Sequence, residues 1–445
     1  MTPSGPFLVP RLRGRVDTTW TVPGSKSLTN RALVCTALAD GGESVIANVL
    51  ESDDTQRMRE CLTAMGVMIR AGAPGELIVR GGRDRLRAPA TPCFVGNSGT
   101  TVRFCAALAA LIPGATTFVG NEHMAKRPIA DLVDGLRQLG VAVDCPTGCP
   151  PLTVHGGRIP GGRIRMRGDR SSQYFTALLL VSGFAEAALE ISVEGELVSL
   201  PYIEMTRRLI ADFGGRIDVV GGSGNGYEAG VSTGFRTTPI RAYQSRRYAA
   251  EPDASSASYP FALAAAGGGR ITVPGLDASS LQGDYAFVEL LRHMGASVSS
   301  DGTDTTVAAP VGGLTGIDAD LHHISDTVMT LAAIAPLCRG DTVIRNVANI
   351  RIKETDRLAA TVTELRRLGQ HVEHGDDWLR ISPRPIVPAT VECYADHRMA
   401  MSFGVLGALT GAVTIADPAC TSKTYPGFWS DLAAVSGAAS TIAPA

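Results

Sequence analysis

The chain has 445 residues and a formal net charge of −2 at pH 7, with 41 lysines and arginines against 43 aspartates and glutamates. This length predicts two or three domains, and a hydrophobic fraction of 44% can fill more than one core. The balanced charge argues against a general nucleic-acid binder, which carries a basic excess. The cations are unevenly divided, because only four of them are lysines: Lys26, Lys126, Lys353 and Lys423.

The first residues contain no basic segment followed by a long apolar run, so we expect no secretory signal. The most apolar stretch, residues 399–416, carries Ser402 and several glycines and threonines, which favours a buried helix and strand over a membrane span. The nine cysteines lack metal-ligand spacing. The sequence therefore predicts a reduced, cytoplasmic protein without a disulfide framework or a metal site.

Amphipathic helices that end in Leu-x-x-x-Gly, or a close variant, recur along the chain, and short alternating segments follow them. The spacings between the final glycines are 74, 74, 81, 74 and 68 residues, and these glycines are Gly66, Gly140, Gly214, Gly295, Gly369 and Gly437. Such regular spacing indicates one supersecondary unit used six times. A glycine in this place predicts a residue with positive φ just beyond the helix end.

The segments after the glycines predict strands around a turn, as at 141–144 with 151–154 and again at 371–381. Helices and strands alternate throughout, so the predicted class is α/β. The longest spacing contains the charged, proline-containing segment 243–253, which predicts a domain boundary with three copies on either side. A ligand site would then lie in the cleft between the two halves.

Two glycine-containing segments in the first half suit close approach of a ligand. Residues 23–31, Pro-Gly-Ser-Lys-Ser-Leu-Thr-Asn-Arg, place Lys26, Ser27 and Arg31 at a predicted helix N-terminus, where backbone amides and cations form an anion site. The spacing of a nucleotide P-loop is absent. Residues 96–103, Gly-Asn-Ser-Gly-Thr-Thr-Val-Arg, open the next helix and indicate either a ligand contact or a plain strand-to-helix corner.

Further polar segments begin predicted helices. Residues 126–128, Lys-Arg-Pro, open one helix with the proline at its first position. Residues 168–173, Gly-Asp-Arg-Ser-Ser-Gln, supply hydroxyls and an amide that suit a helix cap or a phosphate. Residues 351–357 hold three cations and two carboxylates, and residues 322–326 and 396–398 add acids and histidines. No helical zinc motif is present. Together these segments predict an oxyanion site with carboxylates for proton transfer.

In these segments the chain resembles the EPSP synthases of the enolpyruvyl transferase family. The resemblance continues through residues 197–203, 253–259, 396–401 and 420–426, in family order over nearly the whole chain. It implies an α/β fold of two domains, each built from three βαβαββ units, with the active site in the interdomain cleft. It also implies a discontinuous C-terminal domain, 1–22 plus 248–445, around an N-terminal domain of residues 23–247.

The resemblance implies an activity as well. The family transfers the carboxyvinyl group of phosphoenolpyruvate to the 5-hydroxyl of 3-phosphoshikimate, by addition and then elimination of phosphate, in the shikimate pathway to aromatic amino acids. Its partners would be these small molecules alone, without nucleic acid, membrane, metal or organic cofactor, and the expected state is a cytoplasmic monomer.

Residue roles follow from the same resemblance. The phosphoenolpyruvate ligands would be Lys26, Gly99, Arg127, Gln173, Arg357, Arg398 and Lys423. The acceptor ligands would be Ser27, Arg31, Ser171, Ser172, Gln173, Ser199, Tyr202, Asp326, Asn349 and Lys353. Asp326 would take the proton of the attacking hydroxyl, Glu354 with Lys26 would exchange a proton with the enol methylene, and His397 would complete the catalytic set.

The chain departs from the family pattern in several places. Phe104 stands where many members have proline, and Asp169 adds an acid before the phosphate-binding serines that would repel a phosphate unless Arg170 offsets it. His322 and Ser325 replace asparagine and proline near Asp326. The phosphoenolpyruvate half of the site therefore matches the family better than the acceptor half does.

Alternative functions remain open at this point. Members that act on UDP-N-acetylglucosamine carry a reactive cysteine where this chain has Glu122, so that acceptor is disfavoured. A paralogue could use a different shikimate-like acceptor in specialised metabolism. A catalytically silent binding homologue is the third alternative, and the presence of Lys26, Asp326 and Glu354 argues against it.

Overall fold

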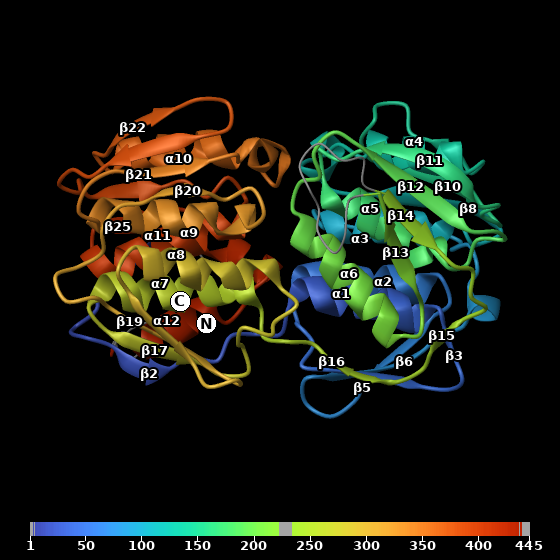
Figure 1. Cartoon of the computed structure of the whole chain (residues 1–445), viewed down its shortest axis with the longest axis horizontal. Coiled ribbons are helices and arrows are strands. Elements are labelled where there is room, and N and C mark those ends of the chain that lie inside the picture. Colours follow the sequence, from blue (N-terminus) through green and yellow to red (C-terminus); the bar gives the residue numbers. More distant parts are fainter. Residues whose placement is uncertain (1–2, 4, 222–233, 436, 438–445) are drawn as a thin grey trace. The chain divides into compact units, whose positions relative to one another are not determined.

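The computed structural model describes residues 3, 5–221, 234–435 and 437. The chain divides into two compact units (Figure 1). We call Gly24–Ala250 the central unit, and Met1–Pro23 together with Glu251–Ala445 the split unit. Pro23 and Glu251 lie next to the predicted domain boundaries, and the assignment of the two units as separate folding domains stays a prediction.

The central unit contains six α-helices and two short 3₁₀ helices among its described residues. The helices are α1 (Lys26–Ala37), α2 (Asp53–Ala64), η1 (Arg83–Arg85), α3 (Gly99–Ala109), η2 (Met124–Lys126), α4 (Ala130–Gln138), α5 (Ser172–Ser182) and α6 (Leu200–Asp212). The strands are β3 (Ala39–Asp40), β4 (Ser44–Ala47), β5 (Met68–Ala71), β6 (Glu76–Arg80), β7 (Cys93–Phe94), β8 (Gly114–Val119), β9 (Ala142–Asp144), β10 (Leu152–Gly156), β11 (Gly162–Arg167), β12 (Leu189–Glu194), β13 (Ile217–Val220), β14 (Gly234–Thr237), β15 (Tyr243–Gln244) and β16 (Arg247–Ala249).

The split unit has the same mixture of elements. Its helices are α7 (Ala254–Gly267), η3 (Gly283–Ala286), α8 (Phe287–His293), η4 (Ser325–Thr327), α9 (Val328–Ile334), η5 (Ala335–Leu337), η6 (Ala348–Ile352), α10 (Arg357–Arg367), α11 (His397–Thr410), η7 (Pro418–Lys423) and α12 (Phe428–Val435). Its strands are β1 (Phe7–Leu8), β2 (Asp17–Thr19), β17 (Arg270–Val273), β18 (Ser297–Ser300), β19 (Thr305–Ala308), β20 (Asp318–Asp320), β21 (Thr342–Arg345), β22 (His371–His374), β23 (Leu379–Ser382), β24 (Ala389–Val391) and β25 (Val413–Ile415).

The five four-stranded sheets of the described residues share one pattern of strand directions. In the sheet β7-β8-β10-β9, the first pair is parallel and the next two pairs are antiparallel. The same directions occur in β16-β4-β6-β5, β11-β12-β14-β13, β2-β17-β19-β18 and β20-β21-β23-β22. The structure is therefore of the predicted α/β class.

Each unit has a core of three helices that are buried along most of their length. In the central unit α3 packs against α5, and α1 contacts both; in the split unit α7, α9 and α11 contact one another. These six sequences are rich in small and apolar residues on every side, which suits helices without a solvent face. The sheets and the amphipathic helices cover them (Figure 1).

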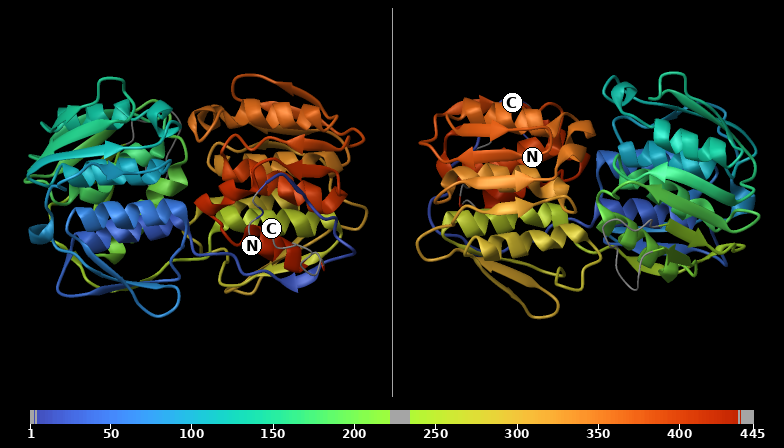
Figure 2. Two further views of the ribbon diagram at one scale, coloured as in Figure 1. Left: turned by 180° about the vertical axis from the view of Figure 1, so that it is seen from behind. Right: turned by 45° about the horizontal axis from the view of Figure 1, so that its top comes forward.

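The N-terminal segment belongs to the split unit (Figure 2). Strand β1 pairs antiparallel with β25, so that Phe7 lies opposite Ile415. Strand β2 pairs in parallel with β17, where Asp17 faces Arg270. Trp20 then donates a hydrogen bond from Nε1 to the Tyr425 hydroxyl at 2.8 Å. Two strand pairings and a buried tryptophan thus hold the start of the chain against its C-terminal part.

Several local predictions are confirmed. All six helix-end glycines have positive φ, between 61° and 106°. The predicted hairpins form as the antiparallel pairs β9–β10 and β22–β23. Residues 399–416 form most of α11 and strand β25, both buried along most of their length. In the part of the chain that the structure describes, no helix has the length and apolar character needed to cross a membrane.

Candidate active site

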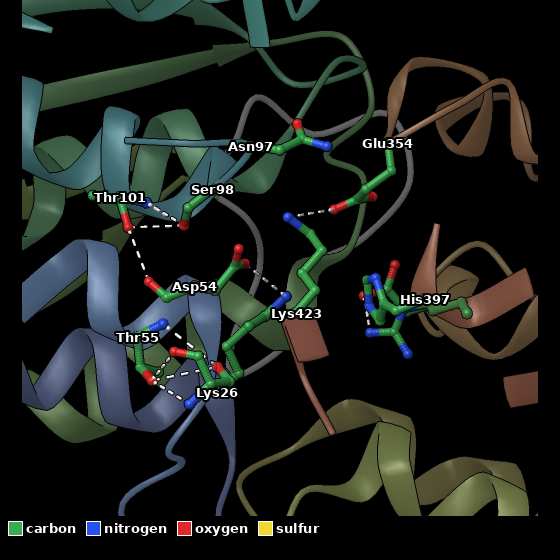
Figure 3. A network of polar contacts seen from close by, with 12 residues as sticks. Lys26, Asp54, Thr55, Asn97, Ser98, Thr101, Glu354, His397 and Lys423 are labelled. Carbon is green, nitrogen blue, oxygen red and sulfur yellow. Dashed lines mark hydrogen bonds and ion pairs between the residues drawn. The ribbon is translucent and has the colours of Figure 1, made fainter. Parts of the chain in front are cut away.

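Lys26 begins α1 in the central unit and faces a carboxylate. The preceding residue, Ser25, caps the helix by accepting from the Leu28 amide at 3.4 Å. Lys26 Nζ lies 3.5 Å from Asp54 Oδ2, and the Asp54 side chain is 5% exposed (Figure 3). The sequence analysis missed Asp54, although its position in the first turn of α2 suggests a polar role. A buried carboxylate beside an ammonium fixes the direction of the lysine side chain.

Hydroxyl groups tie the start of α2 to the start of α3 (Figure 3). Thr101 Oγ1 donates to the Asp54 carbonyl at 3.3 Å. Ser98, the N-cap of α3, accepts from the Thr101 amide at 3.3 Å and lies 2.8 Å from its hydroxyl. The helix start that carries Gly99 is therefore held against the helix that carries the partner of Lys26.

Gly99 is enclosed by two guanidinium groups. A Cβ atom built on Gly99 would lie 2.6 Å from Arg127 Nη2 and 2.8 Å from Arg103 Nη1. Arg127 donates to the Asn97 carbonyl at 3.0 Å, and Arg103 donates to Gln173 Oε1 at 2.6 Å. Both arginines are buried. The missing side chain at Gly99 thus leaves room for two cations at the N-terminus of α3, where the helix dipole also favours an anion.

For phosphoenolpyruvate, the ligand that the family resemblance implies, replacing Gly99 with alanine is expected to raise the KM by about 10- to 100-fold, because displaced binding groups cost this much. The colliding atoms are the ends of flexible side chains, so the melting temperature should change little. Steady-state kinetics with each substrate varied in turn measure the effect. Gly14→Ala is the control, because nothing lies within 4 Å of a Cβ there. An unchanged KM in Gly99→Ala would contradict the placement of the ligand beside these guanidinium groups.

Arg103 is a second residue that the sequence analysis did not assign to the site. It is 4% exposed, its guanidinium lies 5.2 Å from the centre of the Tyr174 ring, and it also donates to the Pro128 carbonyl at 3.2 Å. The prediction that Pro128 opens a helix is wrong, because helix α4 begins at Ala130. The Pro128 carbonyl instead accepts hydrogen bonds from Arg103 and Tyr174. Because Gln173 Oε1 accepts from Arg103, its Nε2 is the amide group left to donate to a ligand.

The predicted phosphate serines begin α5. Ser171 is the N-cap and accepts from the Gln173 amide at 3.3 Å, and Ser172 is the first helical residue. The neighbouring Asp169 pairs with Arg167, and the charge of Arg170 adds a smaller effect in the same direction. Arg167 donates to both carboxylate oxygens at 3.1 and 2.7 Å, and it holds the pKa of Asp169 below its usual range. The extra acid is therefore paired with a cation of its own segment.

Arg31 lies below the surface of the central unit. Its guanidinium donates to the Thr206 hydroxyl at 2.8 Å and to the Ser27 carbonyl at 2.9 Å, and it also bonds Thr176 and the Tyr202 carbonyl. Burial lowers the pKa of Arg31 to about 10. The Phe104 ring lies 5.5 Å from the Arg31 guanidinium. The unusual phenylalanine thus packs on a predicted acceptor ligand.

Two further acceptor residues stand at the start of α6. Ser199 precedes the helix with φ 53° and ψ 43°, a left-handed conformation that non-glycine residues seldom adopt. Tyr202 follows in the first turn, and its ring lies 5.9 Å from the Arg31 guanidinium. Left-handed residues held in place by their surroundings are frequent at functional sites. The geometry of Ser199 is consistent with its predicted role.

In the split unit, Arg357 joins three carboxylates. Its Nε donates to Asp396 Oδ2 at 2.7 Å, its Nη2 donates to Glu354 Oε2 at 2.8 Å, and its Nη1 donates to Asp326 Oδ1 at 3.1 Å. The Arg357 side chain is 2% exposed. Burial alone would lower the pKa of Arg357, but the three carboxylates raise it well above its usual range. The sequence analysis noticed Asp396 as an acid of segment 396–398 but gave it no role; it is fully buried and caps α11.

Asp326 also lies beside the cationic side chains of Arg398 and Lys353. Arg398 Nη2 donates to its Oδ2 at 2.7 Å, and Lys353 Nζ lies 3.7 Å from its Oδ1. Burial lowers the pKa of Lys353, against the opposing effect of Asp326. The nearby Asn349 donates from Nδ2 to the Ser325 hydroxyl at 3.0 Å, so the serine that replaces the family proline orients another predicted acceptor ligand.

Glu354 and His397 complete this cluster (Figure 3). Glu354 Oε1 lies 4.0 Å from Lys423 Nζ, and both side chains are nearly buried. His397 is the first residue of α11, and its Nδ1 lies 3.6 Å from Asp396 Oδ1. The structure thus brings together in the split unit Asp326, Asn349, Lys353, Glu354, Arg357, His397, Arg398 and Lys423.

The composition of this cluster suits anionic ligands. In the described part of the split unit, the cations Lys353, Arg357, Arg398 and Lys423 lie close to the carboxylates of Asp326, Glu354 and Asp396. The guanidinium groups can bind oxyanions through paired N–H donors. Among the described residues, no group of three or more histidine, cysteine, aspartate or glutamate side chains is arranged to hold a metal ion.

Comparisons with known proteins agree on one family. Residues 10–432 match the family model described as EPSP synthase (3-phosphoshikimate 1-carboxyvinyltransferase). A 3-phosphoshikimate 1-carboxyvinyltransferase from Nostoc sp. is 42% identical over 95% of this chain and 97% of its own length. One from Shewanella baltica is 41% identical over 96% of this chain and 98% of its own length.

Solved structures show the same fold. An EPSP synthase from Acinetobacter baumannii superposes with a TM-score of 0.77 over 96% of this chain and 97% of that chain, at 23% identity. A second structure of the enzyme from this organism gives a TM-score of 0.76 at 22% identity. This similarity extends across both units and supports the two-domain α/β architecture.

Proposed function

Because the chain belongs to the EPSP synthase, or 3-phosphoshikimate 1-carboxyvinyltransferase, family, we propose that it carries out the family's reaction. It transfers the carboxyvinyl group of phosphoenolpyruvate to the 5-hydroxyl of 3-phosphoshikimate and releases phosphate. The observation that carries the proposal is the buried Arg357 with Asp326 at one end of its guanidinium and Glu354 at the other. Asp326 and Glu354, which share the Arg357 guanidinium, can supply a general base and a general acid next to an anion site.

The cations bind phosphoenolpyruvate in this proposal. Arg357, Arg398 and Lys423 of the split unit donate to one of its charged groups, and Lys26 and Arg127 of the central unit donate to the other. In the structure, Arg357 and Arg398 both donate to Asp326. A bound anion would therefore compete with Asp326 for these donors.

The proton transfers then follow from the carboxylates. Asp326 takes the proton of the attacking 5-hydroxyl while the oxygen forms a bond to C2 of phosphoenolpyruvate. Glu354, next to Lys423, or Lys26 delivers a proton to C3, so that the methylene becomes a methyl group in the tetrahedral intermediate. Loss of a C3 proton and departure of phosphate regenerate a double bond. The cations stabilise the departing phosphate.

The acceptor is held by residues of both units. Ser171, Ser172 and Gln173 at the start of α5 bind its phosphate, where the helix N-terminus favours an anion. Ser27, Arg31, Ser199 and Tyr202 of the central unit, with Asn349 and Lys353 of the split unit, complete the acceptor set. The location of this site in an interdomain cleft, the monomeric state and the cytoplasmic location stay predictions.

Phosphate release with a panel of acceptors tests the function. The purified chain is supplied with phosphoenolpyruvate and, in separate reactions, 3-phosphoshikimate, shikimate or related cyclic hydroxy acids. We expect turnover with 3-phosphoshikimate, and a large loss with shikimate because the serines of α5 then lack their phosphate. Turnover only with another acceptor would identify the chain as a paralogue, and no turnover with any acceptor would favour the silent homologue.

A further inference from the structure

A short turn directly before Asp396 has an unfavourable backbone conformation. Tyr394 has φ 56° and Ala395 has φ 52°, so two consecutive residues with side chains occupy the left-handed region. Their Cβ atoms crowd the backbone in this conformation. Residues of this kind persist where the surrounding structure holds them, and they gather at functional sites. We call residues 392–395 the 392–395 turn.

A buried carboxylate holds this turn from the side of α10. The Tyr394 hydroxyl donates to Glu364 Oε1 at 2.6 Å, and the Glu392 amide donates to Glu364 Oε2 at 3.2 Å. The Glu364 side chain is fully buried, and Arg367 Nη1 lies 3.2 Å from its Oε2. Burial and the Glu364 carboxylate raise the pKa of Tyr394 to about 12. The tyrosine therefore stays protonated and can donate at neutral pH.

The turn leads directly into the carboxylate that orients Arg357. The Asp396 amide donates to the Cys393 carbonyl at 2.8 Å, which closes the turn. Asp396 Oδ1 accepts from the Arg398 amide at 2.9 Å, and its Oδ2 accepts from Arg357 Nε at 2.7 Å. Helix α10 thus contacts this segment twice: Arg357 at its start binds Asp396, and Glu364 two turns later binds the 392–395 turn.

From this arrangement we propose that Glu364 and Tyr394 are positioning residues for the proposed carboxyvinyl transfer, on which the inference rests. They hold the 392–395 turn in its left-handed conformation, and the turn places Asp396 where it orients Arg357. Neither residue belongs to the predicted ligand set. Their effect on the reaction passes through Arg357, which in turn contacts Asp326 and Glu354. Binding of phosphoenolpyruvate should therefore be affected more than binding of the acceptor.

The test compares Tyr394→Phe with the double variant Tyr394→Phe/Ala395→Gly. The first removes one hydroxyl and the hydrogen bond to Glu364. We expect the KM for phosphoenolpyruvate to rise by about tenfold, in line with the cost of small displacements of binding groups, with the acceptor KM nearly unchanged. Glycine adopts positive φ without strain. The double variant should therefore recover most of the lost affinity, although it restores no hydrogen bond.

Tyr285→Phe is the matched control, because it removes a tyrosine hydroxyl that contacts Thr305 at 2.8 Å in the same unit. It should leave both KM values unchanged. Hydrogen exchange of the peptide covering residues 392–400 gives a readout independent of turnover: exchange should be faster in Tyr394→Phe and slower again in the double variant. Unaltered exchange, or faster exchange with unaltered kinetics, would overturn the positioning role. Absence of turnover in the unmodified chain would instead contradict the proposed function, while the exchange data would still decide whether the turn is held.

Discussion

Replacing Asp326 with asparagine is expected to lower kcat by about 10²- to 10⁴-fold, the range that a positioned general base contributes. The substitution keeps the shape of the side chain and one acceptor for the arginines, but it removes the group that takes the hydroxyl proton. Arg357 and Arg398 both donate to Asp326. The substitution removes a negative charge beside these two cations, so it introduces no repulsion that would weaken phosphoenolpyruvate binding. Stopped-time phosphate assays at saturating substrates measure kcat.

Asp318→Asn is the control for this experiment. Asp318 is an exposed aspartate in the same unit, and both of its oxygens accept from Arg345, at 2.7 and 2.8 Å. We expect its removal to leave kcat unchanged. A kcat within about twofold of the unmodified chain in Asp326→Asn would be too small an effect for general base catalysis and would exclude Asp326 from that role.

Replacing Arg357 with methionine is expected to abolish measurable turnover and to lower the free energy of unfolding by about 3–5 kcal/mol, as for other buried ion pairs that lose one partner. Asp396 is fully buried and Glu354 nearly so, and both would lose their principal cation. Removing the guanidinium leaves the charges of Asp396 and Glu354 buried without their cation. The loss of folding free energy therefore exceeds the contribution of the hydrogen bonds alone.

Urea denaturation followed by far-ultraviolet circular dichroism measures this loss of stability. Arg345→Met is the control, because Arg345 is exposed and pairs with an exposed aspartate; its midpoint should stay close to that of the unmodified chain. If Arg357→Met unfolds at the same urea concentration as the unmodified chain, the three carboxylates do not depend on this guanidinium.

The sequence predicted the fold class and many local features, because they depend on short-range rules. Positive φ at Gly66 and Gly140 follows from the helix that each one ends. The buried character of residues 399–416 follows from their composition. The ligand segments were also visible, since loops at helix starts rich in serine, lysine and arginine have few structural reasons to occur together.

What the sequence left out depends on contacts between distant segments. Asp54 gives no periodic signal, and the roles of Arg103 and Asp396 could not be read from their segments; folding brings the three residues to Lys26, Gln173 and Arg357, respectively. The left-handed residues of the 392–395 turn were invisible for the same reason, since neither Tyr394 nor Ala395 favours that conformation. Asp169 was noticed, but its partner Arg167 could be identified only from the geometry.

The rare lysines are explained by these contacts. Lys26, Lys353 and Lys423 lie 3.5, 3.7 and 4.0 Å from the carboxylates of Asp54, Asp326 and Glu354. Lys126, the fourth, is exposed. A compact ammonium can transfer a proton when burial lowers its pKa, as for Lys353, whereas a guanidinium stays charged. The chain uses arginine for most of its cations, and two of its four lysines lie next to the predicted catalytic carboxylates Asp326 and Glu354.

Deuterium incorporation tests the addition–elimination account most directly. The purified chain is incubated with phosphoenolpyruvate and 3-phosphoshikimate in D₂O, and the product is analysed by mass spectrometry and proton NMR. The account predicts deuterium in the vinyl methylene of the carboxyvinyl product, because C3 becomes a methyl group in the tetrahedral intermediate and then loses one hydrogen. A product whose methylene carries no deuterium would contradict it.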